Sequence, residues 1–193
     1  MPLSEQTRSE LRALRHGVEL PADYFQFMVR WIAFNRAYNE MRFDEEETYR
    51  VLGIGDALQT HWKDITGEAR QLVSLECIGA DRILNHSLLR PNRWVKSATV
   101  FLRSRVSIKP GYPQCANDPA FCRANKVAIC RPVNLEPWER SEMTALLRLV
   151  YQIRCNLFHG EAHLALSDVQ TNHDLKLVAT SMSILNTVFG WLS

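Results

Sequence analysis

The sequence lacks the features that mark several common classes of protein. No run of apolar residues approaches the ~18 that a transmembrane helix needs, so we expect no membrane span and no membrane partner. The first residues, Met1 to Arg8, are polar, so we expect no signal peptide. No two of the five cysteines have C-x-x-C spacing. That pattern is typical of reduced thiols, and we expect a cytoplasmic protein.

The common sequence motifs of catalysis and metal binding are absent as well. The chain has no P-loop and no G-x-G-x-x-G, G-x-S-x-G or H-E-x-x-H pattern. Cys115, Cys122 and Cys130 are spaced by 7 and 8 residues, without the close cysteine pair that structural zinc favours. We therefore expect no metal site and no cofactor.

Lysine is scarce, with 5 residues against 18 arginines, and the basic residues are unevenly placed. The whole chain carries a net charge of +2, whereas the segment 90–131 carries about +8 and the remainder about −6. The basic residues of this segment are Arg90, Arg93, Lys96, Arg103, Arg105, Lys109, Arg123, Lys126 and Arg131. The asymmetry favours a polyanionic partner such as a nucleic acid, bound through these side chains. The alternative is a solvated loop that is rich in arginine.

Apolar residues recur every three or four residues over most of the chain, which is the period of an α-helix. We expect helices at 4–15, 21–42, 44–62, 68–90, 137–160 and 171–191, with a break or kink at Gly53 and Gly55. The second of these is apolar over most of its circumference, so we expect it in the middle of a bundle. The five remaining histidines, of which His163 is the nearest to His159, are interpreted as surface or capping residues: His16, His61, His86, His163 and His173.

The segment 91–132 differs from the rest, because prolines punctuate it and two short β-like runs occur at Ser97–Leu102 and Lys126–Cys130. We interpret it as an insertion or long connection between helices. The length of 193 residues then fits one domain, 1–193. The predicted fold is all-α, an up-and-down bundle of about five to six helices with a long basic insertion between the fourth and fifth helices.

Polar residues cluster at the end of the helix that precedes Gly160. Arg154, Cys155, Asn156 and His159 lie in its last turns, and the negative end of the helix dipole favours a charged imidazole at His159. Taken alone, an arginine and a histidine at a helix end are more often a cap and an ion-pair partner than a catalytic pair.

The run Arg154 to Gly160 resembles the R-x4–6-H motif of HEPN domains, including the aromatic residue before the histidine and the glycine after it. The run Trp31 to Tyr38 is similar to the aromatic early helix of one group of these domains. The resemblance covers roughly residues 20–90 and 135–190. It implies an α-helical homodimer in which Arg154 and His159 of both subunits line one cleft.

The resemblance also implies an activity, that of a metal-independent endoribonuclease, often a toxin or an antiviral effector. His159 would act as base or acid when a ribose 2′-OH attacks the neighbouring phosphate, and Arg154 would stabilise the charge on that phosphate. The products would be a 2′,3′-cyclic phosphate and a 5′-OH end. RNA, a second copy of the chain and an antitoxin protein are the implied partners.

Cys155 departs from the family pattern, which often has a polar residue after the arginine. Asn156 could take that role, while Asn35 and His163 are candidates for further support of the site. We interpret Cys155 itself as a small buried residue and Tyr38 as a packed core aromatic. The departure keeps a second function open, a non-catalytic HEPN module that binds a nucleotide or a protein partner.

Overall fold

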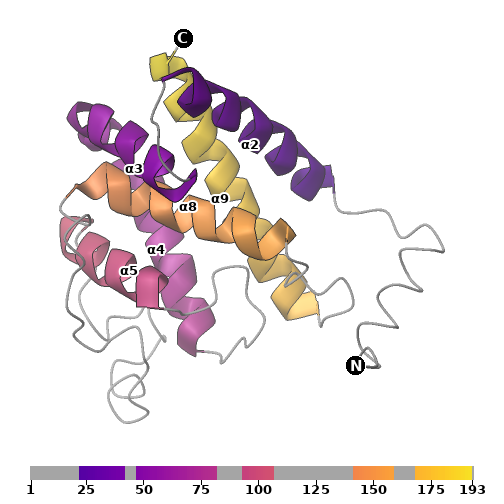
Figure 1. The fold of residues 1–193 in the computed structure, drawn as a ribbon. Helices are drawn as coiled ribbons and strands as arrows, with labels where there is room; N and C mark the ends of the chain where they lie inside the picture. Colours follow the sequence, from indigo (N-terminus) through magenta and orange to yellow (C-terminus); the bar gives the residue numbers. More distant parts are fainter. Residues whose placement is uncertain (1–21, 42–46, 82–92, 107–140, 159–167, 193) are drawn as a thin grey trace, which may run out of the picture.

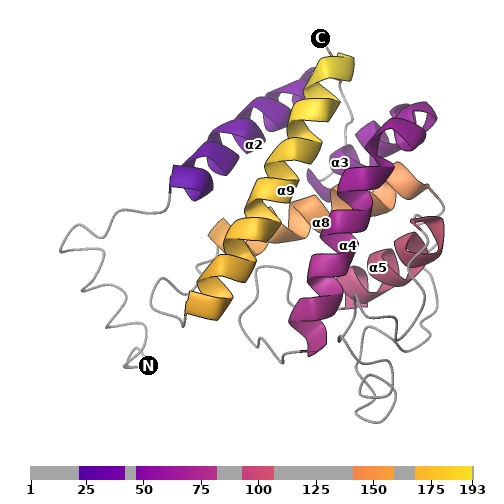
Figure 2. The same ribbon diagram turned by 180° about the vertical axis from the view of Figure 1, so that it is seen from behind.

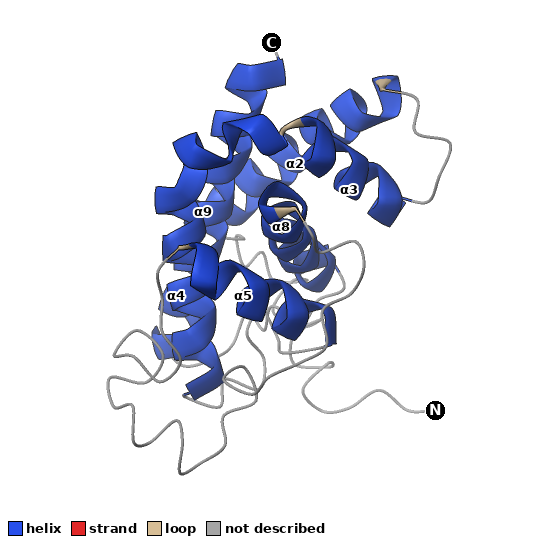
Figure 3. Cartoon of the chain, turned by 90° about the vertical axis from the view of Figure 1, so that its left-hand side faces the viewer, coloured by secondary structure: helices blue, strands red, loops and turns tan. Residues whose placement is uncertain are grey.

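The described part of the chain is entirely α-helical in architecture. The computed structural model describes residues 22–41, 47–81, 93–106, 141–158 and 168–192. Within these ranges there are six α-helices, one 3-10 helix and no strand (Figure 3). The elements are α2 (Ala22–Glu40), α3 (Glu47–Ala57), η1 (Gln59–Ile65), α4 (Thr66–Asp81), α5 (Arg93–Arg105), α8 (Glu142–Phe158) and α9 (Asp168–Leu192). The all-α fold of about six helices is therefore confirmed.

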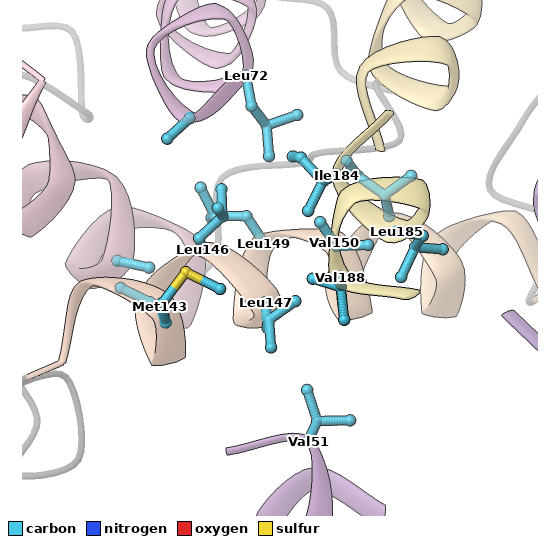
Figure 4. Packing of buried hydrophobic residues seen from close by; sticks show 14 of the residues in the cluster. Val51, Leu72, Met143, Leu146, Leu147, Leu149, Val150, Ile184, Leu185 and Val188 are labelled. Carbon is cyan, nitrogen blue, oxygen red and sulfur yellow. The ribbon is translucent and has the colours of Figure 1, made fainter. Parts of the chain in front are cut away.

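Helix α8 runs through the centre of the bundle (Figure 1). Ten of its 17 residues are buried, because neighbouring helices cover it from several sides. Val51 of α3 approaches it from one side, and Leu72 of α4 and Ile184 of α9 from the other (Figure 4). The core thus fixes the position of α8, and with it the last turns of this helix, which carry the candidate functional residues.

Helices α2 and α9 pack side by side, and α9 lies between α2 and α4 when the molecule is seen from behind (Figure 2). The Arg30 Nε atom donates a hydrogen bond to the Asn186 Oδ1 atom at 2.9 Å, which joins the two helices at their edge. The core face of α2 consists of aromatic residues that are at most 1% exposed: Phe27, Trp31, Phe34 and Tyr38.

The predicted position of α2 in the middle of the bundle is wrong. The described helices cover one face of α2, and the opposite face presents Phe25, Val29 and Ile32, which are 59%, 46% and 63% exposed. These three residues are spaced by four and three positions, so they form one apolar stripe on the outside of the helix. We call them the α2 stripe.

Two further expectations are corrected. Helix α3 continues through Gly53 and Gly55, so these glycines do not break it. The predicted β-like run at Ser97–Leu102 belongs to helix α5, whose Val95, Ala98 and Leu102 are buried at helical spacing. The segment 91–132 therefore begins with a helix of the core, and the second β-like run and residues 107–132 lie outside the described residues.

Helix α9 is the one described helix that is long and apolar enough to cross a membrane, over Asn172–Leu192. A helix in the core of a bundle passes the same test of length and composition. The inner residues of α9, such as Leu177, Ile184 and Val188, belong to the main cluster of buried residues. We therefore interpret α9 as a core helix.

Candidate functional site

Arg154 is the described member of the predicted catalytic pair. It lies on α8 one turn before the last residue of that helix, Phe158, and is half-buried. His159 and His163 lie outside the described residues. The geometry of the candidate site is therefore built around Arg154.

The Arg154 guanidinium is surrounded by aromatic rings. Its central carbon Cζ lies 4.8 Å from the centre of the Phe158 ring, 5.8 Å from Trp31 and 6.0 Å from Tyr151. A cation at such distances is attracted by the electron-rich face of an aromatic ring. One guanidinium nitrogen also lies 3.8 Å from the Cys155 sulfur. These contacts hold the charge of Arg154 at the junction of α8 and α2.

Arginines and aromatic residues alternate along one side of α8. Arg148, Tyr151, Arg154 and Phe158 follow each other at spacings of three, three and four residues, and the Cζ atom of Arg148 lies 5.4 Å from the Tyr151 ring centre. We call these four residues the Arg–aromatic row. Arg148 is 7% exposed and Phe158 is 44% exposed, so the row leads from the core to the surface.

Helix α2 completes the surroundings of Arg154 from the other side. The Trp31 ring lies 5.9 Å from the Tyr151 ring, between centres, and this contact joins α2 to α8. Tyr38 is 1% exposed and packs edge-to-face on Phe34, so its interpretation as a core aromatic is confirmed. Asn35 is half-buried and lies one turn after Trp31.

The two residues that follow Arg154 differ in burial. Asn156 is 5% exposed, and its Oδ1 atom accepts a hydrogen bond from the Gln152 Nε2 atom at 2.7 Å, one turn earlier in α8. Cys155 is half-buried, so it is less buried than predicted from the sequence. The Asn156 amide is therefore partly engaged within its own helix.

The predicted RNA-contacting residues divide into several groups. Arg103 is 4% exposed, so in this structure its side chain lies among the buried residues rather than at the surface. Arg105 is half-exposed, but it forms an ion pair with Glu142 at 3.2 Å. Arg93 and Lys96 belong to α5. Five of the predicted residues lie outside the described residues: Arg90, Lys109, Arg123, Lys126 and Arg131.

A buried polar pair near the start of α9 was not predicted from the sequence. His173 and Asp174 are 7% and 2% exposed, so the surface interpretation of His173 is wrong. Burial raises the pKa of the Tyr24 hydroxyl far above its usual value, and the nearby negative charge of Asp174 raises it further. A signal was present in the sequence, because the buried pattern of Leu177 and Val178 reaches Asp174 when it is extended back by one turn.

Metal ligands were not expected at this site. Across the described ranges, no three His, Cys, Asp or Glu side chains are gathered closely enough to hold a metal ion. Cys115, Cys122 and Cys130 fall in the range 107–140, which is not described.

Comparison of the chain with protein-family models, characterised proteins and solved structures finds no match. The similarity to HEPN domains therefore rests on the residues quoted above.

Proposed function

We propose that the chain is a metal-independent endoribonuclease of the HEPN type, acting in the cytoplasm as a toxin or as an antiphage or stress effector. The observation that carries the proposal is the placement of Arg154. Its guanidinium lies among Phe158, Trp31 and Tyr151, in the turn that directly precedes His159 in the sequence. A half-buried guanidinium at a helix end is suited to binding a phosphate through two parallel hydrogen bonds.

The proposed reaction needs one base, one acid and one cation. His159 of one subunit removes the proton from a ribose 2′-OH, and the oxygen then attacks the adjacent phosphorus. Arg154 stabilises the negative charge that develops on the phosphate oxygens. A second protonated histidine donates its proton to the departing 5′-oxygen. The products are a 2′,3′-cyclic phosphate and a 5′-OH end, and DNA is left intact because it has no 2′-OH.

A homodimer would supply the second histidine. The α2 stripe of Phe25, Val29 and Ile32 supports a second copy as a partner, because a soluble chain seldom leaves such a row of apolar residues uncovered. Trp31, which contacts Arg154, lies on the buried face of the same helix, so an interface on the α2 stripe would lie on the other side of α2 from Arg154, about one helix diameter away. An antitoxin protein remains a further proposed partner.

The activity is tested by incubating the purified chain with an end-labelled RNA in excess EDTA. We expect the wild type to cut the RNA and to leave 5′-OH ends that a polynucleotide kinase labels directly. His159→Ala and Arg154→Ala should each lower the rate at least 100-fold, which is a usual contribution of a general acid or base and of a charge-stabilising group. Arg70→Ala removes an exposed arginine of α4 and is the matched control.

Two outcomes would contradict the proposal. One is RNA that stays intact with the wild type, and the other is cleavage that His159→Ala does not reduce. RNA or nucleotide binding without any cleavage would favour the alternative, a non-catalytic module in which Arg154 serves binding alone.

A further inference from the structure

Phe158 is an exposed aromatic residue that lies beside a cation, the Arg154 guanidinium. It is 44% exposed at the end of α8, and its ring centre lies 4.8 Å from the Arg154 guanidinium carbon. In the Arg–aromatic row, Arg148 is buried and Tyr151 and Arg154 are half-buried. Phe158 is thus the member of the row that presents the most of its surface to a ligand.

The two exposed phenylalanines among the described residues differ in their surroundings. Phe25 is 59% exposed and has the apolar Val29 and Ile32 beside it, so its surroundings suit contact with the apolar surface of another protein. Phe158 instead adjoins a cation that is itself in contact with two more rings. A ring and a cation side by side fit a ligand that combines a flat apolar group with an anion.

A nucleotide has these two groups, a planar base and a phosphate, joined by one sugar. Proteins that bind single strands use the same combination, with aromatic side chains under the bases and cations along the backbone. We infer that Phe158 is a base-stacking residue that selects the nucleotide whose phosphate Arg154 binds. This inference rests on the proposed function and adds a specificity to it: a purine at the Phe158 position, because its larger ring covers more of the phenylalanine face.

The test measures binding with RNA analogues that cannot be cut. Three 2′-O-methyl decamers are compared at one salt concentration: all adenine, all uracil, and a backbone of the same charge without bases. The variants are Phe158→Leu, which keeps an apolar side chain but removes the ring, and Phe158→Tyr, which keeps a ring. Fluorescence anisotropy gives the dissociation constants. Since residue 158 is exposed, neither substitution is expected to disturb the core.

We expect the wild type to bind the adenine decamer more tightly than the uracil decamer, and the backbone without bases most weakly. Phe158→Leu should weaken adenine binding at least 5-fold, because stacking on one aromatic ring contributes about 5- to 150-fold. The same variant should bind the backbone within about twofold of the wild type, and Phe158→Tyr should keep the adenine preference.

Equal losses for all three decamers, or no loss for any, would overturn the inference. The outcome is separable from the proposed cleavage. A wild type that cuts RNA while Phe158→Leu leaves the base preference unchanged refutes the stacking role alone. A base preference that depends on Phe158, in a chain that cuts nothing, refutes the nuclease alone.

Discussion

Gly55 of α3 packs directly against the backbone of Thr144 in α8. A β-carbon at residue 55 would lie 2.7 Å from the Thr144 Cα atom and 2.9 Å from its backbone nitrogen. Real Cβ atoms essentially never come within 3.0 Å of another residue's atoms, and these two atoms belong to the backbone, which cannot turn aside. Gly55 is therefore the reason that α3 and α8 can approach each other so closely.

Gly55→Ala should destabilise the protein by about 1–3 kcal/mol, since the added methyl group forces two core helices apart. Gly67→Ala is the matched control, because a β-carbon there meets no atom within 4 Å. That control should be neutral or more stable by up to about 1 kcal/mol, as alanine favours a helix over glycine. Urea denaturation measures both, and equal stability of the two variants would contradict the close contact.

Tyr24 should make the free energy of unfolding depend on pH in alkaline solution. Its pKa is raised in the folded state by burial and by Asp174, so above about pH 10 the unfolded chain loses the proton while the folded chain keeps it. Ionisation then favours the unfolded state, and stability falls by up to about 1.4 kcal/mol per pH unit. Tyr24→Phe cannot ionise and should lack this part of the decline. The difference between the two urea-unfolding series from pH 9 to 11.5 isolates it, and a constant difference would contradict the prediction.

Charge on the α2 stripe should separate the proposed dimer. Ile32 is 63% exposed, so Ile32→Asp is tolerated in a monomer but places a charge in an apolar interface. Sedimentation equilibrium at micromolar concentration should show a dimer for the wild type and a monomer for Ile32→Asp, with RNA cleavage lost in parallel. Gln71→Asp introduces the same charge on the exposed side of α4 and should stay dimeric. A monomeric wild type that cleaves RNA would refute the shared cleft.

The basic segment should contribute to RNA binding through its charge. Helix α5 belongs to the core through buried residues such as Leu102, so the test has to leave this helix intact. Replacing Lys109, Arg123 and Lys126 by glutamine tests the remainder without touching the core helix. The slope of log affinity against log salt concentration should become shallower by about 2, since each phosphate contact to a single strand contributes about 0.7. An unchanged slope would exclude these three residues from the contact.

The sequence predicted the elements whose pattern is local. Helix α2 was expected at 21–42 and is found at Ala22–Glu40, because Pro21 and the aromatic spacing are both signals within one helix. Helix α5 was missed because Thr99, Val100 and Phe101 favour strands by local preference, whereas burial against α8 decides the outcome. The local sequence pattern does not indicate which face of α2 packs against another helix.

The candidate site, too, was predicted from the sequence only where the signal is local. Arg154 was predicted on a late helix, and it lies there. Its contact with Trp31 joins residues 123 positions apart, and no periodicity of either helix encodes it. The burial of His173 and Asp174 was not predicted because polar residue types suggest exposure, although both residues lie on the buried side of α9.

The two ends of α8 have different roles: the first attaches the helix to η1, and the second carries Arg154 and Phe158. At its start, the Gln59 side chain accepts hydrogen bonds from Ser141 Oγ and the Met143 backbone nitrogen and donates one to Glu142, which fixes the helix to η1. Arg154 lies about 18 Å farther along, at 1.5 Å per residue. Phe158 and the residues around it can therefore be exchanged without loosening that attachment. If Phe158 has the stacking role that we infer, new nucleotide preferences could be engineered at this residue while the attachment of α8 to η1 stays intact.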